Sequence, residues 1–149
     1  MSLFKTTFGS LFLLLLLTAC PRETMPDQSL EDSSWVLLKF SIEDGTIQEP
    51  QGEKPITLKF AADQASGSAG CNSYFAAYQY EAKSGQLHFN GIGATEMYCM
   101  GLMEQEQQYL GLLEQAQSYA IRPGQLEISS QGGKLLFKNE NADSVGQEP

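Results

Sequence analysis

Gly67-Ser-Ala-Gly-Cys-Asn-Ser-Tyr74 and Ala94-Thr-Glu-Met-Tyr-Cys99 are the two stretches of sequence that decide how this chain folds. Each contains a cysteine beside small or turn-forming residues, which let two backbones approach closely. A strand-rich segment precedes the first stretch, and a helix-like segment followed by further strands comes after the second. A cross-link between Cys71 and Cys99 would therefore join the middle of the fold.

A third cysteine, Cys20, follows an N-terminal targeting segment. Lys5 supplies a positive region, and the apolar run from Phe8 to Ala19 is well short of the about 20 residues that a membrane-spanning helix needs. This pattern predicts a cleaved signal peptide over residues 1–19.

The end of that segment, Leu17-Thr-Ala-Cys20, resembles a bacterial lipobox. The resemblance implies that Cys20 receives a lipid, becomes the mature N-terminus and holds the protein on a membrane of the cell envelope. In bacteria with two membranes, Asp at the next position favours the inner membrane. Here the residue is Pro21, so we expect the outer membrane, with the protein facing the periplasm.

The charge of the chain limits its partners. The net charge is −9, and loss of Lys5 with the signal peptide makes it −10. Such a chain repels nucleic acid and anionic lipid head groups, and the sequence shows no cluster of basic residues that offsets this. The expected partners are the membrane, through the lipid, and an envelope protein, while nucleic acid is excluded.

Cys71 and Cys99 form an even pair in an exported, oxidising compartment, so we expect a disulfide between them. Closing a loop of this length would stabilise the fold by about 3.6 kcal/mol. The alternative is a pair of reduced thiols packed in the core.

The remaining sequence predicts a single domain at 34–139, between a flexible tether at 20–33 and a disordered tail at 140–149. In the first strand Val36, Leu38 and Phe40 share one face. Alternating or aromatic-rich patterns predict strands at 35–40, 56–60, 63–70, 74–80, 86–89, 118–122, 125–129 and 134–138, with Gly91 and Gly93 loosening the chain after the fifth.

The period changes over 102–117, where apolar residues recur on one side of a predicted helix. Glu104 and Glu106 lie near its N-terminus and are expected to be solvated on its polar face. The predicted fold class is mainly β (α+β), a small antiparallel barrel-like curled sheet with one covering α-helix.

Several of these segments together resemble the META domain, the family of HslJ-like bacterial lipoproteins, over about residues 33–139. The resemblance implies a compact barrel-like fold and an envelope setting linked to stress and antibiotic tolerance, with no reaction attached. The segments are Trp35-Val-Leu, Ile56-Thr-Leu-Lys-Phe60 and the two cysteine-bearing stretches, and the family motif falls on Gly70, Cys71, Asn72, Tyr74, Thr95, Met97 and Cys99.

Within this motif we expect structural roles. Asn72 follows a cysteine in a glycine-rich bend, where Asn can bond its own backbone and tolerate a positive φ. Thr95 is expected to bond backbone near the helix entry, and Met97 to fill the core. Whether Glu96 is buried stays open.

No catalytic, metal or cofactor site is predicted. His88 is the only histidine, and strand alternation turns it towards solvent. A nucleophilic pair with Cys71 or Cys99 conflicts with the expected disulfide, and the spacing of these residues matches no zinc motif.

The sequence therefore favours a non-enzymatic envelope lipoprotein that acts in stress or antibiotic tolerance through its surface. One alternative is a carrier of a small apolar ligand inside the sheet. Another is a partner-binding or inhibitor module that uses an exposed turn at 43–45 or an aromatic patch near Tyr74 and Tyr98. The candidate lining of the carrier is Phe40, Phe60, Tyr78, Phe89 and Phe137.

Overall fold

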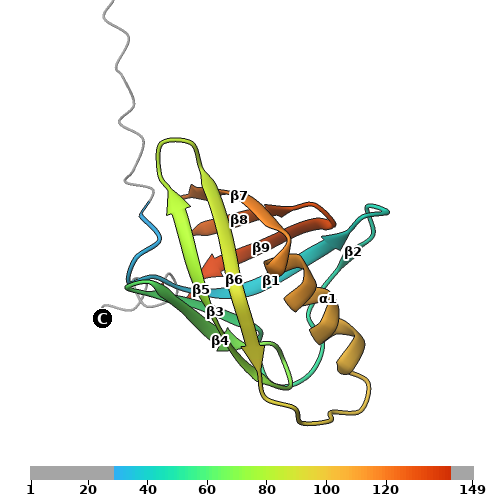
Figure 1. The fold of residues 1–149 in the computed structure, drawn as a ribbon. Coiled ribbons are helices and arrows are strands. Elements are labelled where there is room, and N and C mark those ends of the chain that lie inside the picture. Colours follow the sequence, from blue (N-terminus) through green and yellow to red (C-terminus); the bar gives the residue numbers. More distant parts are fainter. Residues whose placement is uncertain (1–28, 142–149) are drawn as a thin grey trace, which may run out of the picture.

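The computed structural model describes residues 29–141, which form nine strands and one helix (Figure 1). The predicted signal peptide, Cys20, most of the tether and residues 142–149 of the tail lie outside the described residues. The elements are β1 Ser34–Ile42, β2 Ile47–Gln48, β3 Thr57–Ala61, β4 Gln64–Ser68, β5 Ser73–Glu81, β6 Gln86–Ala94, α1 Met103–Glu114, β7 Ala116–Arg122, β8 Gln125–Ser130 and β9 Gly133–Asn139.

The strands form a closed antiparallel barrel. Their order is β1-β3-β4-β5-β6-β7-β8-β9, and β9 pairs with β1 to close the ring of eight. The short strand β2 is added to β1, where Phe40 and Ser41 pair with Gln48 and Ile47. A closed barrel leaves few strand edges for unwanted pairing. The predicted fold class is confirmed, and the three-strand meander predicted from residue 118 onwards corresponds to β7, β8 and β9.

The first strand departs from the predicted alternation. The register between β1 and β9 shifts between Leu37 and Lys39, and Trp35, Leu37 and Phe40 are the buried side chains. A bulge adds one residue to a strand and so reverses which side chains face inward. The prediction that Val36, Leu38 and Phe40 share one face of the strand was therefore wrong.

The strand predicted at 56–60 corresponds to β3 and has the predicted alternation, and its close contact with β4 requires a glycine there. Ile56, Leu58 and Phe60 are fully buried. Opposite them, a Cβ on Gly67 of β4 would lie 2.0 Å from the carbonyl oxygen of Thr57. No side chain fits at that distance, so the close contact between β3 and β4 requires glycine.

The ring of eight strands has its shortest ladder pairing between β6 and β7. Among residues 29–141, ladder pairing of these strands is limited to Gln86 and Ser118. The helix α1 packs beside this seam, against β6 and β9 (Figure 1). β6 also runs through Gly91 and Gly93 to Ala94, so the strand extends beyond the predicted end at residue 89. Gly91 has a φ of 62° and lies where the register between β5 and β6 shifts, so the predicted loosening is a local irregularity within a longer strand.

The packed domain begins earlier than predicted. Leu30 is fully buried in the core. The Ser33 hydroxyl donates to the Leu30 carbonyl and accepts a hydrogen bond from Trp35 Nε1 at 2.8 Å. Residues 29–33 therefore belong to the domain and not to the expected tether.

We expect Gly67→Ala to destabilise the protein by at least about 2 kcal/mol, because the added methyl group meets backbone that cannot move freely. The matched control is Gly111→Ala in α1, where a Cβ meets no atom within 4 Å. It should stabilise by about 0.5–1 kcal/mol through helix propensity. Urea unfolding measures both. Equal stabilities for the two variants would contradict the close contact between β3 and β4.

Candidate functional site: the braced loop between β6 and α1

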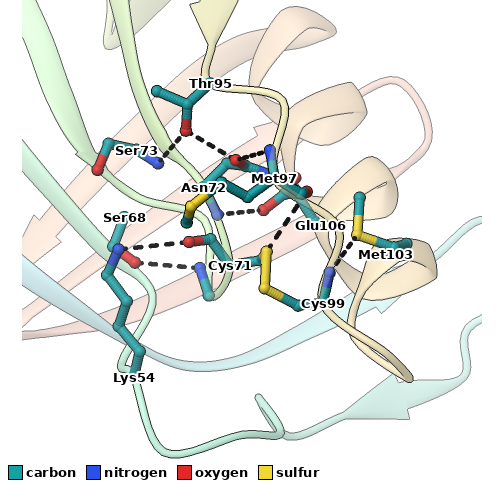
Figure 2. Close-up of a disulfide and its surroundings, with 11 residues drawn as sticks. Lys54, Ser68, Cys71, Asn72, Ser73, Thr95, Met97, Cys99, Met103 and Glu106 are labelled. Atoms are coloured by element: carbon teal, nitrogen blue, oxygen red, sulfur yellow. Dashed lines mark hydrogen bonds between the residues drawn. A yellow bond between two sulfur atoms is a disulfide. The ribbon is translucent and has the colours of Figure 1, made fainter.

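A disulfide joins the turn before β5 to the loop after β6. Cys71 and Cys99 are bonded, with 5.9 Å between their Cα atoms (Figure 2). The predicted bond is confirmed, and the alternative of two reduced thiols is wrong. The disulfide brings the two halves of the family motif together at one end of the barrel.

Both the oxygen and the nitrogen of the Asn72 side-chain amide form hydrogen bonds that hold the loop after β6. Its Oδ1 accepts hydrogen bonds from Thr95 Oγ1 and the Met97 N–H, both at 2.7 Å. Its Nδ2 donates to the Met97 carbonyl at 3.0 Å and to Glu106 Oε1 at 2.6 Å (Figure 2). Asn72 is 1% exposed. These four bonds hold the loop at residues 95–97 against the turn and the helix.

These contacts correct the predicted geometry of the motif. Asn72 does not bond its own backbone, and the positive φ of 99° belongs to Gly70. The Thr95 hydroxyl accepts the Ser73 N–H at 3.3 Å as well as donating to Asn72, so the expected contact of Thr95 with backbone is present, on β5.

Glu106, at the start of α1, belongs to the same hydrogen-bonded cluster as Asn72, Thr95 and Met97. We call this cluster the brace. Glu106 is 4% exposed, and its carboxylate accepts the Asn72 backbone N–H at 2.7 Å in addition to Asn72 Nδ2. Hydrogen bonds to a charged acceptor are stronger than neutral ones. The prediction of a solvated Glu106 was wrong. Helical spacing could have found it, since Tyr109 and Leu113, three and seven residues later, are buried on the same face.

Gln105, the neighbour of Glu106, ties a second loop to the helix. Its Oε1 accepts the Gln51 N–H at 2.6 Å, and its Nε2 donates to the Gln51 carbonyl at 3.2 Å. Nearby, Lys54 Nζ donates to the Cys71 carbonyl at 3.4 Å. The start of α1 is therefore bound to the loop before β3 and to the disulfide turn.

The braced loop presents large apolar side chains to solvent. Met97, Tyr98 and Met100 are 57%, 78% and 87% exposed. We call these three residues the apolar loop. The prediction that Met97 fills the core was wrong, and Glu96, whose burial the sequence left open, is exposed. Contiguous exposed apolar residues mark interaction sites more often than single ones do.

A buried pair of tyrosines follows Asn72 and Glu106 in the sequence, Tyr74 on β5 and Tyr109 on α1. The hydroxyls of Tyr74 and Tyr109 are 2.7 Å apart, and Tyr74 also donates to the Thr57 carbonyl at 2.9 Å. Burial raises the pKa of both hydroxyls well above the usual value. Because Tyr74 is 3% exposed, the predicted aromatic patch of Tyr74 and Tyr98 is wrong.

The other residues singled out in the sequence lie elsewhere. His88 Nδ1 is 3.2 Å from the Ala116 carbonyl, at the seam between β6 and β7. Within residues 29–141, no group of three or more His, Cys, Asp or Glu side chains could hold a metal ion. In the same part of the chain, no helix is long and apolar enough to span a membrane.

Comparison with models of protein families identifies the family of this domain. The META domain model matches residues 28–142, which include the barrel, the brace and the disulfide. The chain belongs to the META domain family. No match was found among curated proteins.

Three solved structures resemble this META domain. An NMR structure of a protein from Burkholderia xenovorans is 32% identical, with a TM-score of 0.63, covering 74% of this chain and 83% of that one. A second NMR structure is 22% identical, with a TM-score of 0.57 and coverage of 72% and 88%. A crystal structure of a DUF4847 family protein from Bacteroides vulgatus is 14% identical, with a TM-score of 0.51 and coverage of 72% and 92%. The last two support the META fold alone.

Exchanging the polar partners tests the brace. Asn72→Asp sets two carboxylates against each other and should cost about 3–5 kcal/mol. Glu106→Gln keeps the hydrogen bond from the Asn72 N–H but sets the NH₂ group of Gln against the NH₂ group of Asn72. We expect this to lower the free energy of unfolding by about 1–3 kcal/mol. In the double variant the Gln side chain can donate to the Asp, so we expect a favourable coupling of about 0.5–3 kcal/mol.

Urea unfolding of the four proteins in this cycle gives the coupling. Glu104→Gln, on the exposed side of the same turn, is the control and should change stability by less than about 0.5 kcal/mol. Strict additivity of Asn72→Asp and Glu106→Gln would show that the two side chains do not act together.

The buried tyrosines predict a loss of stability at high pH. Burial, helped by the nearby negative charge of Glu31, raises the pKa of Tyr78 to about 12, and the pKa values of Tyr74 and Tyr109 are also raised. Folded pKa values above the unfolded value of about 10 give stability that is complete below pH ~10 and is lost as pH rises through the folded values.

Spectrophotometric titration should therefore show at least three of the six tyrosines ionising only near pH ~12 or on unfolding. The same titration in guanidinium chloride, where all six should ionise near pH ~10, is the control. A single transition of all six near pH ~10 in protein that circular dichroism shows to be folded would contradict the prediction.

Proposed function

We propose that this META domain protein is a non-enzymatic lipoprotein of the bacterial envelope, acting in stress or antibiotic tolerance by binding another envelope protein. A lipid on Cys20 would anchor it to the outer membrane, on the periplasmic side. The apolar loop is the observation that carries the proposal. The signal peptide and the lipobox-like Leu17-Thr-Ala-Cys20 support the location.

The support under the apolar loop favours binding. Both the N–H and the carbonyl of Met97 are bonded to Asn72, and the disulfide holds Cys99 two residues further on. A loop that is fixed before binding loses less conformational entropy when a partner arrives. Methionine and tyrosine are enriched at protein interfaces, and methionine adapts to irregular surfaces.

The chemistry of the site favours binding over catalysis. The amide of Asn72 and the carboxylate of Glu106 are occupied with each other and with the loop. The sulfurs of Cys71 and Cys99 are joined, and a disulfide sulfur has no thiolate with which to attack a substrate. These side chains hold the surface in place.

The packing inside the barrel favours a surface role over that of a carrier. The ring of Phe60 lies 4.8 Å from that of Tyr78 and 6.1 Å from that of Phe89, and the ring of Tyr109 lies 6.5 Å from that of Phe137. The residues expected to line a ligand cavity are thus buried among other side chains of the core.

The charge around the apolar loop indicates what the partner presents. Glu96 lies directly before the apolar loop and Glu104 follows it in the first turn of α1, and both are exposed. The whole chain carries a net charge of −9. A partner with an apolar groove and a basic rim complements this surface, and opposite charges speed the encounter.

Photo-cross-linking from position 98 in envelopes of the native host tests the partner. With benzoylphenylalanine at Tyr98 we expect one dominant cross-linked protein, which Met97→Ser with Met100→Ser should abolish. Leu38→Ser, which removes a side chain 37% exposed on β1, is the matched control and should retain the cross-link. Equal cross-linking by the Met variant and the control would refute the apolar loop as the contact surface.

Membrane fractionation of the same cells tests the location. The wild-type protein should sediment with the outer membrane, and Cys20→Ser should lower this fraction, because the lipid can no longer be attached. Equal sedimentation of both proteins would refute anchoring through Cys20.

A further inference from the structure

A second feature lies on the outer surface of β1, β7, β8 and β9, away from the residues of the apolar loop. It is an open hollow of about 260 Å³. Lys39 from β1, Arg122 from the end of β7 and Lys134 from β9 line it, together with the apolar residues Ile47 and Leu136. We call it the basic hollow.

Strand pairing brings these distant residues together. Lys39 of β1 and Glu127 of β8 both pair with Leu136 of β9, so the three lie side by side across the barrel. Lys134 pairs with Ser41, two residues further along the same pair of strands. The prediction that the chain has no basic cluster was wrong, because these basic residues come together only where β9 closes the barrel against β1 (Figure 1).

The charges of the basic hollow do not balance. Glu127, the carboxylate among its lining residues, lies 3.1 Å from Lys134 Nζ and 3.8 Å from Arg122 Nη1. The glutamate side chain is 26% exposed, so it holds the two cationic groups at the rim from a partly buried position. Lys39 has no ion pair within residues 29–141. Three cations thus face one carboxylate in a chain with a net charge of −9.

An apolar wall stands beside these cations. Ile47 is 64% exposed on the two-residue strand β2, which is paired with Phe40 and Ser41 at the edge of the basic hollow. Leu136 is partly buried on the neighbouring strand. Positive groups beside an exposed branched side chain suit a ligand with one anionic and one apolar end.

We propose that the basic hollow binds a small amphiphilic anion, a phosphate or carboxylate group on an apolar body. Lys39, which has no ion pair in the described chain, and Arg122 would hold the anionic group, with Lys134 beside them, since a guanidinium matches the geometry of both anions. Ile47 and Leu136 would contact the apolar end. The volume lies below the range of about 300–1,000 Å³ typical of drug-sized ligands, so the bound part is a single ring or a short chain.

The test uses the full chain in phosphatidylcholine nanodiscs, with amide NMR signals followed during addition of phenyl phosphate. We expect saturable shifts at Ser41, Glu127 and Lys134. Inorganic phosphate lacks the apolar end and benzyl alcohol lacks the charge, so each should bind about tenfold more weakly or worse. Equal affinity for phosphate and phenyl phosphate would refute the apolar contact, and no saturable shift with phenyl phosphate would overturn the proposal.

Charge-matched variants separate the basic hollow from the net charge of the chain. Lys39→Gln with Arg122→Gln should weaken phenyl phosphate binding by about tenfold or more. Lys59→Gln with Lys83→Gln removes the same charge elsewhere on the barrel and should change affinity by less than about twofold. Equal losses in the two pairs would show a general charge effect and overturn the site.

The source of the anion is read from the same signals without a probe. If replacing part of the phosphatidylcholine by phosphatidylglycerol shifts Ser41 and Lys134 in the wild type and not in the Lys39/Arg122 variant, the ligand is a lipid head group. If phenyl phosphate alone causes the shifts, it is a free anion. The Met97→Ser/Met100→Ser variant should bind phenyl phosphate normally, since the apolar loop takes no part.

Discussion

The hydrogen-bonded pair of Asn72 and Glu106 is the interaction on which the end of the barrel depends. A buried carboxylate costs several kcal/mol unless strong donors face it, and here both donors come from Asn72. The side chain of the same asparagine also bonds the main-chain N–H and carbonyl of Met97. One residue pair therefore fixes the turn before β5, the loop after β6 and the start of α1. The disulfide adds a covalent limit on their separation.

The pair also matters for closure of the barrel. β6 and β7 share little ladder pairing in the described chain, and α1 packs beside that seam. A helix of 12 residues is marginal in isolation, so its position comes from what it contacts. Gln105 and Glu106 bind its start to two loops, while Tyr109, Leu112 and Leu113 enter the core. The polar residues near the N-terminus of α1 thus orient the apolar residues that the helix packs into the core.

Sequence patterns predicted what repeats along the chain and missed what depends on a single contact. Period-two alternation gave the inner face of Ile56, Leu58 and Phe60 and the class of the fold. The bulge in β1 adds one residue, and nothing in the alternation of the sequence marks its position. Leu30 is buried by residues distant in the sequence, whereas its sequence neighbours are polar and predicted a tether. The exposed Met97 is apolar, so composition assigned it to the core. Lys39 and Lys134 meet only after the barrel closes.

The exposure of the apolar loop follows from its support. A flexible loop with Met97, Tyr98 and Met100 would lower its free energy by folding these side chains back onto the barrel, because apolar surface is driven out of water. Asn72 prevents this at Met97, since both main-chain polar groups of that residue are bonded inward and its side chain is left outside. The disulfide at Cys99 restricts the segment between Tyr98 and Met100. The buried polar network therefore keeps an apolar surface in water, and this exposed surface is the feature on which the proposed binding role rests.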